Sequence, residues 1–249
     1  MFEKHGEIDI AWRCNPQEFN CKNIYVVVNG EMGFVPLITA VAMVGDEEPD
    51  IEIYSAGQGI EAFNNIPNPV ADCWKITKIT ERTAVLEITN FVEIVMIPQE
   101  SHETWKTTYP MMRDLLLWLK KIGIKSLTFL TAMNSKNAED AGEMMVADLY
   151  HGIAPEHPIT VATPAWAMPK LFNRMGGKSC VVCFLQDAGQ FICDKTIATA
   201  KDYILASGLP YDEECAMQQR EALMGMEEQI NAMRNPFGFD GSGDGGEWL

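Results

Sequence analysis

The chain has 249 residues, of which 47% are hydrophobic and 22% are charged, and its formal net charge is −16. This balance is typical of a globular chain with one large domain or a domain with a small appendage. The acidic excess argues against a nucleic-acid partner and against an anionic membrane surface, because both carry negative charge. No run approaches the roughly 20 apolar residues of a membrane span. The seven irregularly spaced cysteines predict reduced thiols and a cytoplasmic location.

The first half of the chain alternates short strand-like runs with one apolar helix. Residues 23–28 are a β-branched run that predicts a strand, and residues 34–44, apolar nearly all round, predict a buried helix ended by Gly45. Residues 74–79 and 83–88 alternate on either side of a short turn, which predicts a hairpin. Further strands are expected at 51–54 and 91–97.

The second half predicts helices and strands in a more regular order. One helix begins near Thr107, has Pro110 in its first turn and ends at Gly123. Asn137 can cap another helix over 138–150. The other predicted elements are strands at 126–131, 159–162 and 179–185, and helices at 169–175, 195–206 and 211–234.

Repeated strand-then-helix order with long crossovers predicts a sheet between two helix layers. The expected fold class is α/β, a three-layer sandwich with a mostly parallel or mixed sheet. We divide the chain into an α/β domain over 1–209, a C-terminal amphipathic helix over 210–234 and a flexible, acidic, Gly-rich tail over 235–249. The positions expected to be buried are Val26, Val28, Val95, Phe129 and Val182.

The C-terminal helix carries a narrow apolar seam. Its members recur at the spacing of a coiled coil, and they are Ala216, Leu223, Met226, Ile230 and Met233. This seam is too thin to cover a globular core, so we expect it to pack on a partner helix, most simply in a homo-oligomer. The alternative, in which the seam folds back on its own domain, is equally open.

Two local patterns invite a chemical interpretation. Cys180 and Cys183 have the spacing of half a zinc or redox site, but residues three apart in a strand face opposite sides and no second half exists. We therefore predict structural thiols, no metal and no cofactor. Residues 29–33 join a strand to a helix where many α/β proteins bind phosphate, yet they lack the phosphate-loop motifs.

The histidines do not predict a catalytic site. Ser101, His102 and Glu103 are adjacent in sequence, and in an extended segment their side chains splay apart. Glu156 and His157 can act as an acid–base pair, although a solvated loop explains them more simply. No catalytic residue is therefore predicted.

The order of elements carries a resemblance to a known family. It rests on a strand, Gly-containing turn and helix at 24–44, a strand–helix–strand block at 92–131 and a block of two strands and a helix at 159–185. A Gly-Leu step at 206–209 and an acidic Glu-Glu-Gln-Ile phrase at 227–230 follow. In this order the chain resembles the proteasome assembly chaperone family, in particular the branch of the second chaperone and its archaeal relatives.

The resemblance implies a nucleoside-phosphorylase-like architecture without its catalytic residues. It also implies binding to α-type subunits of the proteasome core particle during ring assembly. Family members often dock through three C-terminal residues in a hydrophobic–tyrosine–any pattern, and this chain ends in Glu247, Trp248 and Leu249, which keeps the penultimate aromatic. The predicted partner-binding residues are Trp248, Leu249, Leu223, Met226, Ile230 and Met233.

The alternative function is that of a small-molecule hydrolase or transferase with the same fold. Open α/β sheets bind ligands at the loops that follow their strands, here 29–33, 132–136 and 163–167. Convergent polar groups around a deep cavity at these loops would favour the enzyme, and an apolar-filled crevice would favour the chaperone.

Overall fold

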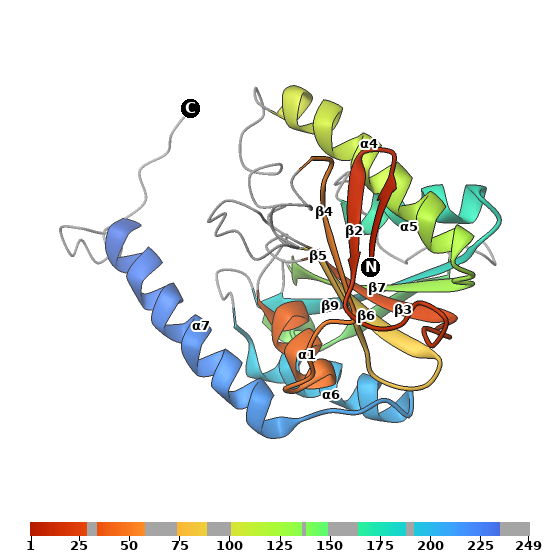
Figure 1. Ribbon diagram of the computed structural model, residues 1–249. Helices are drawn as coiled ribbons and strands as arrows, with labels where there is room; N and C mark the ends of the chain where they lie inside the picture. Colours follow the sequence, from red (N-terminus) through yellow and green to blue (C-terminus); the bar gives the residue numbers. More distant parts are fainter. Residues whose placement is uncertain are drawn as a thin grey trace.

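The structure is a computed structural model of the whole chain (Figure 1). It describes residues 1–28, 34–57, 74–88, 101–135, 138–148, 164–187 and 192–234. Within these ranges, the side chains of 101–109, of 226–234 and of a few residues at other segment ends lie outside the description.

The described part of the chain forms one nine-stranded mixed sheet, in the order β1-β2-β4-β5-β6-β3-β7-β9-β8. The four strands β6, β3, β7 and β9 run parallel at its centre, and antiparallel strands flank them on both sides. The strands are β1 (Phe2–His5), β2 (Ile8–Trp12), β3 (Asn23–Val28), β4 (Ile51–Ser55), β5 (Trp74–Lys78), β6 (Thr83–Ile88), β7 (Ser126–Ser135), β8 (Met144–Asp148) and β9 (Lys178–Asp187).

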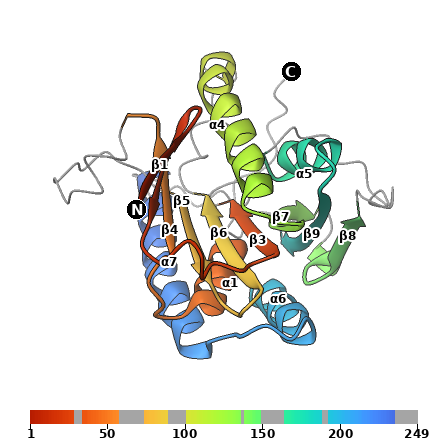
Figure 2. The ribbon, with the colours of Figure 1, turned by 45° about the vertical axis from the view of Figure 1, so that its right-hand side comes forward.

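Helices cover both faces of the sheet (Figures 1 and 2). Helices α4 and α5 lie on one face, α1 and α6 lie on the other, and α7 runs along α1 on its outer side. The helices are α1 (Val35–Val44), α4 (Ser101–Lys121), α5 (Pro164–Arg174), α6 (Asp194–Ala206) and α7 (Glu213–Arg234), with a short 3-10 turn at Ala138–Asp140. The predicted three-layer α/β sandwich is confirmed.

Two apolar clusters fill the spaces between the sheet and its helix layers. One includes Phe129 of β7 with Trp118 of α4 and Phe172 of α5, all fully buried. The other includes Val182 and Phe184 of β9 with residues of α1 and α6. The predicted burial of Val26, Phe129 and Val182 is confirmed, whereas the side chains of Val28 and Val95 lie outside the described part.

Several elements begin and end where local signals predict. Helix α1 ends at Gly45, which has φ +62°, a left-handed conformation that favours glycine. Strands β5 and β6 form the expected hairpin, with Thr77 opposite Val85. The strands expected at 91–97 and 159–162 fall outside the described residues.

The helix expected over 138–150 is wrong. The 3-10 turn at Ala138–Asp140 is followed by Gly142, which has φ +93°, and the chain then continues as strand β8. Strand β8 pairs antiparallel with β9, with Met144 opposite Phe184. A long-range backbone ladder therefore outweighs the local helix signals of Asn137 and its acidic neighbours.

Two helices begin earlier than expected, and a hairpin was missed. Helix α4 starts at Ser101, so Pro110 lies inside it rather than in its first turn. Helix α5 starts at Pro164 and contains Pro169 in the same way. Strands β1 and β2 form an N-terminal hairpin around Gly6, and it packs on α4.

None of the helices in the described ranges combines the length and apolar character needed to cross a bilayer.

Candidate functional site

Helix α7 is fixed at its first turn to the end of α1. The Asp212 N–H donates to the Ala42 carbonyl of α1 at 2.7 Å. The Asp212 carboxylate accepts hydrogen bonds from the N–H groups of Glu214 at 2.9 Å and Cys215 at 3.0 Å. Asp212 is therefore an N-cap, which satisfies two otherwise unpaired amides and sets the direction in which α7 leaves the domain.

The first half of the apolar seam is buried against the chain's own α1. Ala216 is 6% exposed and Leu223 is 4% exposed, and both pack with Ile38 and Ala42. The two seam residues are seven apart, so they lie on one face of α7, two turns from each other. Leu223, predicted to bind a partner, thus contacts its own domain in this structure.

Ion pairs tie the same half of α7 to α6. Lys201 of α6 pairs with Glu213, and Arg220 of α7 pairs with Asp194 at 2.8 Å. Beneath them a hollow of about 600 Å³ lies between α1, α6 and α7. Burial in this region raises the pKa of Tyr211 to about 12, and the nearby Glu213 carboxylate acts in the same direction.

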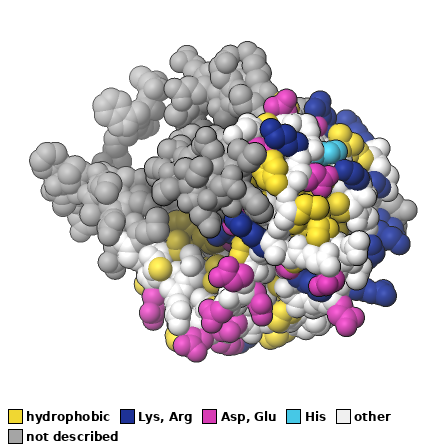
Figure 3. Space-filling view, in the orientation of Figure 1, with side chains coloured by type: hydrophobic (Ala, Val, Ile, Leu, Met, Phe, Trp, Pro, Cys, Tyr) yellow, Lys and Arg dark blue, Asp and Glu magenta, His cyan; other side chains and the backbone are white. Residues whose placement is uncertain are grey.

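The outward side of α7 combines exposed methionines with acidic side chains. Met217 is 56% exposed and Met224 is 40% exposed, and Glu214 and Glu221 are also exposed. Figure 3 shows Asp and Glu side chains gathered over the lower part of the molecule, where α7, α1 and α6 lie. Methionine is flexible and polarizable, so this surface can adapt to an apolar partner with a basic rim.

Helix α7 is much longer than the helix that supports it. Helix α1 has 10 residues and α7 has 22, which correspond to about 15 Å and about 33 Å. Because α7 starts at the C-terminal end of α1 and runs back along it, about 18 Å of α7 extends past the start of α1. Figure 1 shows this part leaving the body of the domain.

Apart from Leu223, the predicted partner-binding residues fall on this projecting half and on the tail. Met226, Ile230 and Met233 lie on the helical backbone of α7, with side chains outside the description. Trp248 and Leu249 lie beyond the last described residue. Their contact with a partner stays a prediction.

The structure describes only some of the residues for which the sequence allowed a chemical role. Cys180 packs against the cluster on the α1 and α6 face, whereas Cys183 belongs to the cluster on the α4 and α5 face, so their side chains point to opposite sides of β9. Among the described side chains, no group of three His, Cys, Asp or Glu residues is arranged to hold a metal ion.

The turn at 29–33 and the pair Glu156 and His157 lie outside the described residues. Ser101, His102 and Glu103 form the first turn of α4, not the extended segment we expected, and their side chains are not described.

Sequence reasoning missed the residues that anchor α7. Asp212 is the second residue of the helix predicted over 211–234, whereas the observed helix begins at Glu213, so the sequence predicted the helix but not its capping residue. The pairing of Arg220 with Asp194 carries no local signal, because the two residues are 26 positions apart and belong to different helices.

Comparison with known proteins identifies the fold. No family model matches the sequence, and no curated protein matches it. Among solved structures, PbaA of Pyrococcus furiosus, an archaeal homolog of proteasome-assembly chaperone, matches 91% of this chain and 99% of its own, with a TM-score of 0.60 and 14% identity. PbaB of the same organism, an archaeal proteasome activator, covers the same shares with a TM-score of 0.60 and 11% identity.

This chain has the fold of PbaA and PbaB. A protein of unknown function from Thermoplasma acidophilum has it as well, with a TM-score of 0.56 and 13% identity over 89% of this chain and 92% of its own. The resemblance inferred from the order of elements is therefore confirmed at the level of the fold.

Proposed function

We propose that this chain is a non-catalytic, proteasome-assembly-chaperone-like protein that binds α-type subunits of the proteasome core particle. The observation that carries the proposal is the fold shared with PbaA and PbaB over 91% of this chain. The form of α7 supports it, because one half is anchored to the domain and the other half projects from it.

In this proposal the three parts of the chain have separate roles. Residues 1–209 are the α/β domain, residues 210–234 carry the tail away from it, and residues 235–249 are a flexible tether. Residues 240–246 include four glycines and two aspartates, a composition that gains little by folding. The tether ends in Trp248 and Leu249, two large apolar side chains beside the C-terminal carboxylate.

The tail has enough apolar surface to contribute to binding but not to bind tightly alone. Burying Trp248 and Leu249 in a partner pocket would contribute about 3–5 kcal/mol. A partner Lys or Arg on the carboxylate would add about 1.5–3 kcal/mol. Ordering the tether offsets several kcal/mol of this, so the folded domain must supply further contacts.

The test compares two variants of the same tail in binding to α-type subunits or core particles from the same source. W248S/L249S keeps the tail length and the carboxylate but removes the docking side chains. The control, F237S/F239S, removes two aromatic side chains close to the helix end. We expect the first variant to weaken binding at least about tenfold and the control to change it by less than about threefold.

The two parts of the proposal fail in different ways. Absence of binding by the unmodified chain would refute the role in proteasome assembly. Equal binding by the unmodified chain and W248S/L249S would leave that role intact and show that the tail is not the docking element.

A further inference from the structure

A row of cations lies at the amino ends of the central parallel strands. Lys22, Arg82 and Lys125 each stand directly before the first residue of a strand, β3, β6 and β7 in turn. These three strands are neighbours in the sheet, with β3 in the middle. The row is thus at the edge of the sheet opposite to the one where α/β proteins of this kind usually bind ligands.

Backbone hydrogen bonds hold the row in register. The Lys22 N–H donates to the Arg82 carbonyl at 2.8 Å, and the Lys125 N–H donates to the Lys22 carbonyl at 2.8 Å. The Lys178 N–H, at the start of β9, donates to the Lys125 carbonyl at 3.0 Å. Neighbouring strands are about 4.8 Å apart. The backbone from Arg82 to Lys178, at the starts of four neighbouring strands, therefore spans about 14 Å.

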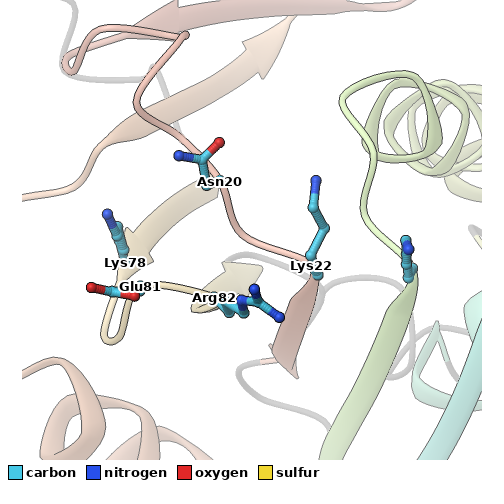
Figure 4. Close-up of a pocket in the computed structure, with 6 residues that line it drawn as sticks. Asn20, Lys22, Lys78, Glu81 and Arg82 are labelled. Atoms are coloured by element: carbon cyan, nitrogen blue, oxygen red, sulfur yellow. The ribbon is translucent and has the colours of Figure 1, made fainter.

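The cations line a hollow of about 670 Å³. Its lining side chains are Asn20, Lys22, Lys78, Glu81, Arg82 and Lys125. Figure 4 shows Lys22 and Lys78 extending to the same side of the strand ends, with Asn20 between them. Four positive charges against one carboxylate give the lining a formal charge of +3, in a chain whose net charge is −16.

These positive charges are not balanced within the described part of the protein. No ion pair joins Lys22, Lys78, Arg82 or Lys125 to another described residue, whereas Arg13 pairs with Glu52 at 2.5 Å. Lys121 pairs with Glu3 at 2.7 Å in the same way. Figure 3 shows Lys and Arg side chains gathered along the right-hand edge of the view. Like charges held together repel one another, and an anion bound among them relieves this repulsion.

We propose that this hollow binds a small ligand that carries two or more oxyanionic groups, phosphates or carboxylates. The guanidinium group of arginine and the ammonium group of lysine bind phosphates and carboxylates through charge-assisted hydrogen bonds. The Asn20 amide adds a neutral hydrogen-bond donor. Because the cations stand on separate strands, a ligand with several anionic groups can contact more of them than a single anion can. This site is separate from α7 and the tail, and it goes beyond the proposed role in proteasome assembly.

The experiment measures binding of three anions to the full chain by calorimetry at about 50 mM salt, where screening is weak. The probes are inorganic triphosphate, ATP and citrate. The test variant is R82Q/K125Q, and the matched control is K170Q/K195Q, which removes two exposed positive charges outside the hollow, from α5 and α6. We expect triphosphate to bind the unmodified chain, R82Q/K125Q to raise its Kd at least about tenfold, and the control to change it less than about twofold.

The three probes distinguish the sources of the anionic groups. Binding of triphosphate and ATP without citrate supports a phosphate ligand, and tighter binding of ATP than of triphosphate supports a nucleotide. Similar binding of citrate supports recognition of oxyanions in general. No binding of any probe at about 1 mM, or an equal loss in both double variants, would overturn the proposal.

Discussion

Replacing Asp114 with asparagine should loosen the N-terminal hairpin from α4 and lower the stability of the domain. The Asp114 carboxylate accepts a hydrogen bond from the Glu7 N–H at 2.9 Å, just after the hairpin turn at Gly6. On its other side it pairs with Arg113, the next residue of α4, at 2.8 Å. The substitution keeps the shape of the side chain and removes its charge.

The size of the effect follows from how far each contact is shielded from water. The Asp114 side chain is 6% exposed, so its charge-assisted bond to the Glu7 N–H contributes about 1.5 kcal/mol. The Arg113 side chain is 48% exposed, and solvent screening limits that ion pair to less than about 1 kcal/mol. Asparagine retains one acceptor oxygen, so we expect a loss of about 1–2 kcal/mol at pH 7, or about 2–8 °C in Tm.

The loss should depend on pH. The Arg113 guanidinium and the Glu7 N–H together hold the pKa of Asp114 below its ordinary value, against the opposing effect of burial. A carboxyl group whose pKa is lower when folded stabilises the fold fully above its unfolded pKa of about 3.9, and the contribution disappears as pH falls through the folded pKa. The difference between the native chain and D114N should therefore be constant near neutrality and shrink below about pH 4.

Urea unfolding followed by circular dichroism at several pH values is a suitable assay, with D202N as control, since Asp202 is exposed on α6. An equal loss in D114N and D202N would refute the reasoning, as would a loss that does not change with pH. Gly6→Ala tests the same contact from the other side, because a Cβ on Gly6 would lie 2.0 Å from the Asp114 Oδ2. It should destabilise more than Gly57→Ala, where φ is also positive but no atom lies within 4 Å.

Two further predictions concern α7. Leu223→Ala should lower the free energy of unfolding by about 2–4 kcal/mol, because it leaves a cavity against α1, whereas Met217→Ala on the exposed side should change it by less than about 0.5 kcal/mol. Equal effects of the two substitutions would show that α7 does not dock on α1 in solution. Light scattering at micromolar concentration should give the mass of a homo-oligomer. A variant with lysine in place of Met226, Ile230 and Met233 should have a smaller mass, because these seam residues would no longer pack on a partner helix. A monomer mass for the unmodified chain would contradict the prediction.

The sequence predicts elements well where the signal is local. The hairpin of β5 and β6 and the helix that ends at Gly45 each depend on a few adjacent residues with a clear physical preference. Strand β8 could not be predicted in this way, because it depends on pairing with β9, whose residues lie 32 to 40 positions later in the chain. Asn137, Glu139 and Asp140 are residues typical of the start of a helix, but pairing with β9 stabilises a strand in the residues that follow.

The candidate site also combines features that have a local sequence signal with features that depend on tertiary packing. The existence of α7 and its apolar spacing follow from sequence, and Asp212 marks its start. That Leu223 packs on Ile38, almost 190 residues earlier in the chain, depends on the packing of the layers and has no local signal. The cationic hollow could not be predicted for the same reason. Its lining residues are far apart in sequence, and only the pairing of neighbouring strands brings them together.

The separation of charge across the molecule has a consequence for how it meets other molecules. The amino edge of the central strands is basic, and the region of α1, α6 and α7 is acidic, so charge is separated across the described part of the protein and gives that part an electric dipole. In the field of a charged partner, a dipole experiences a torque before any contact forms, and it rotates during diffusion. A partner with a basic rim therefore meets the α7 end first, and collisions at the opposite edge are rarer than chance would give.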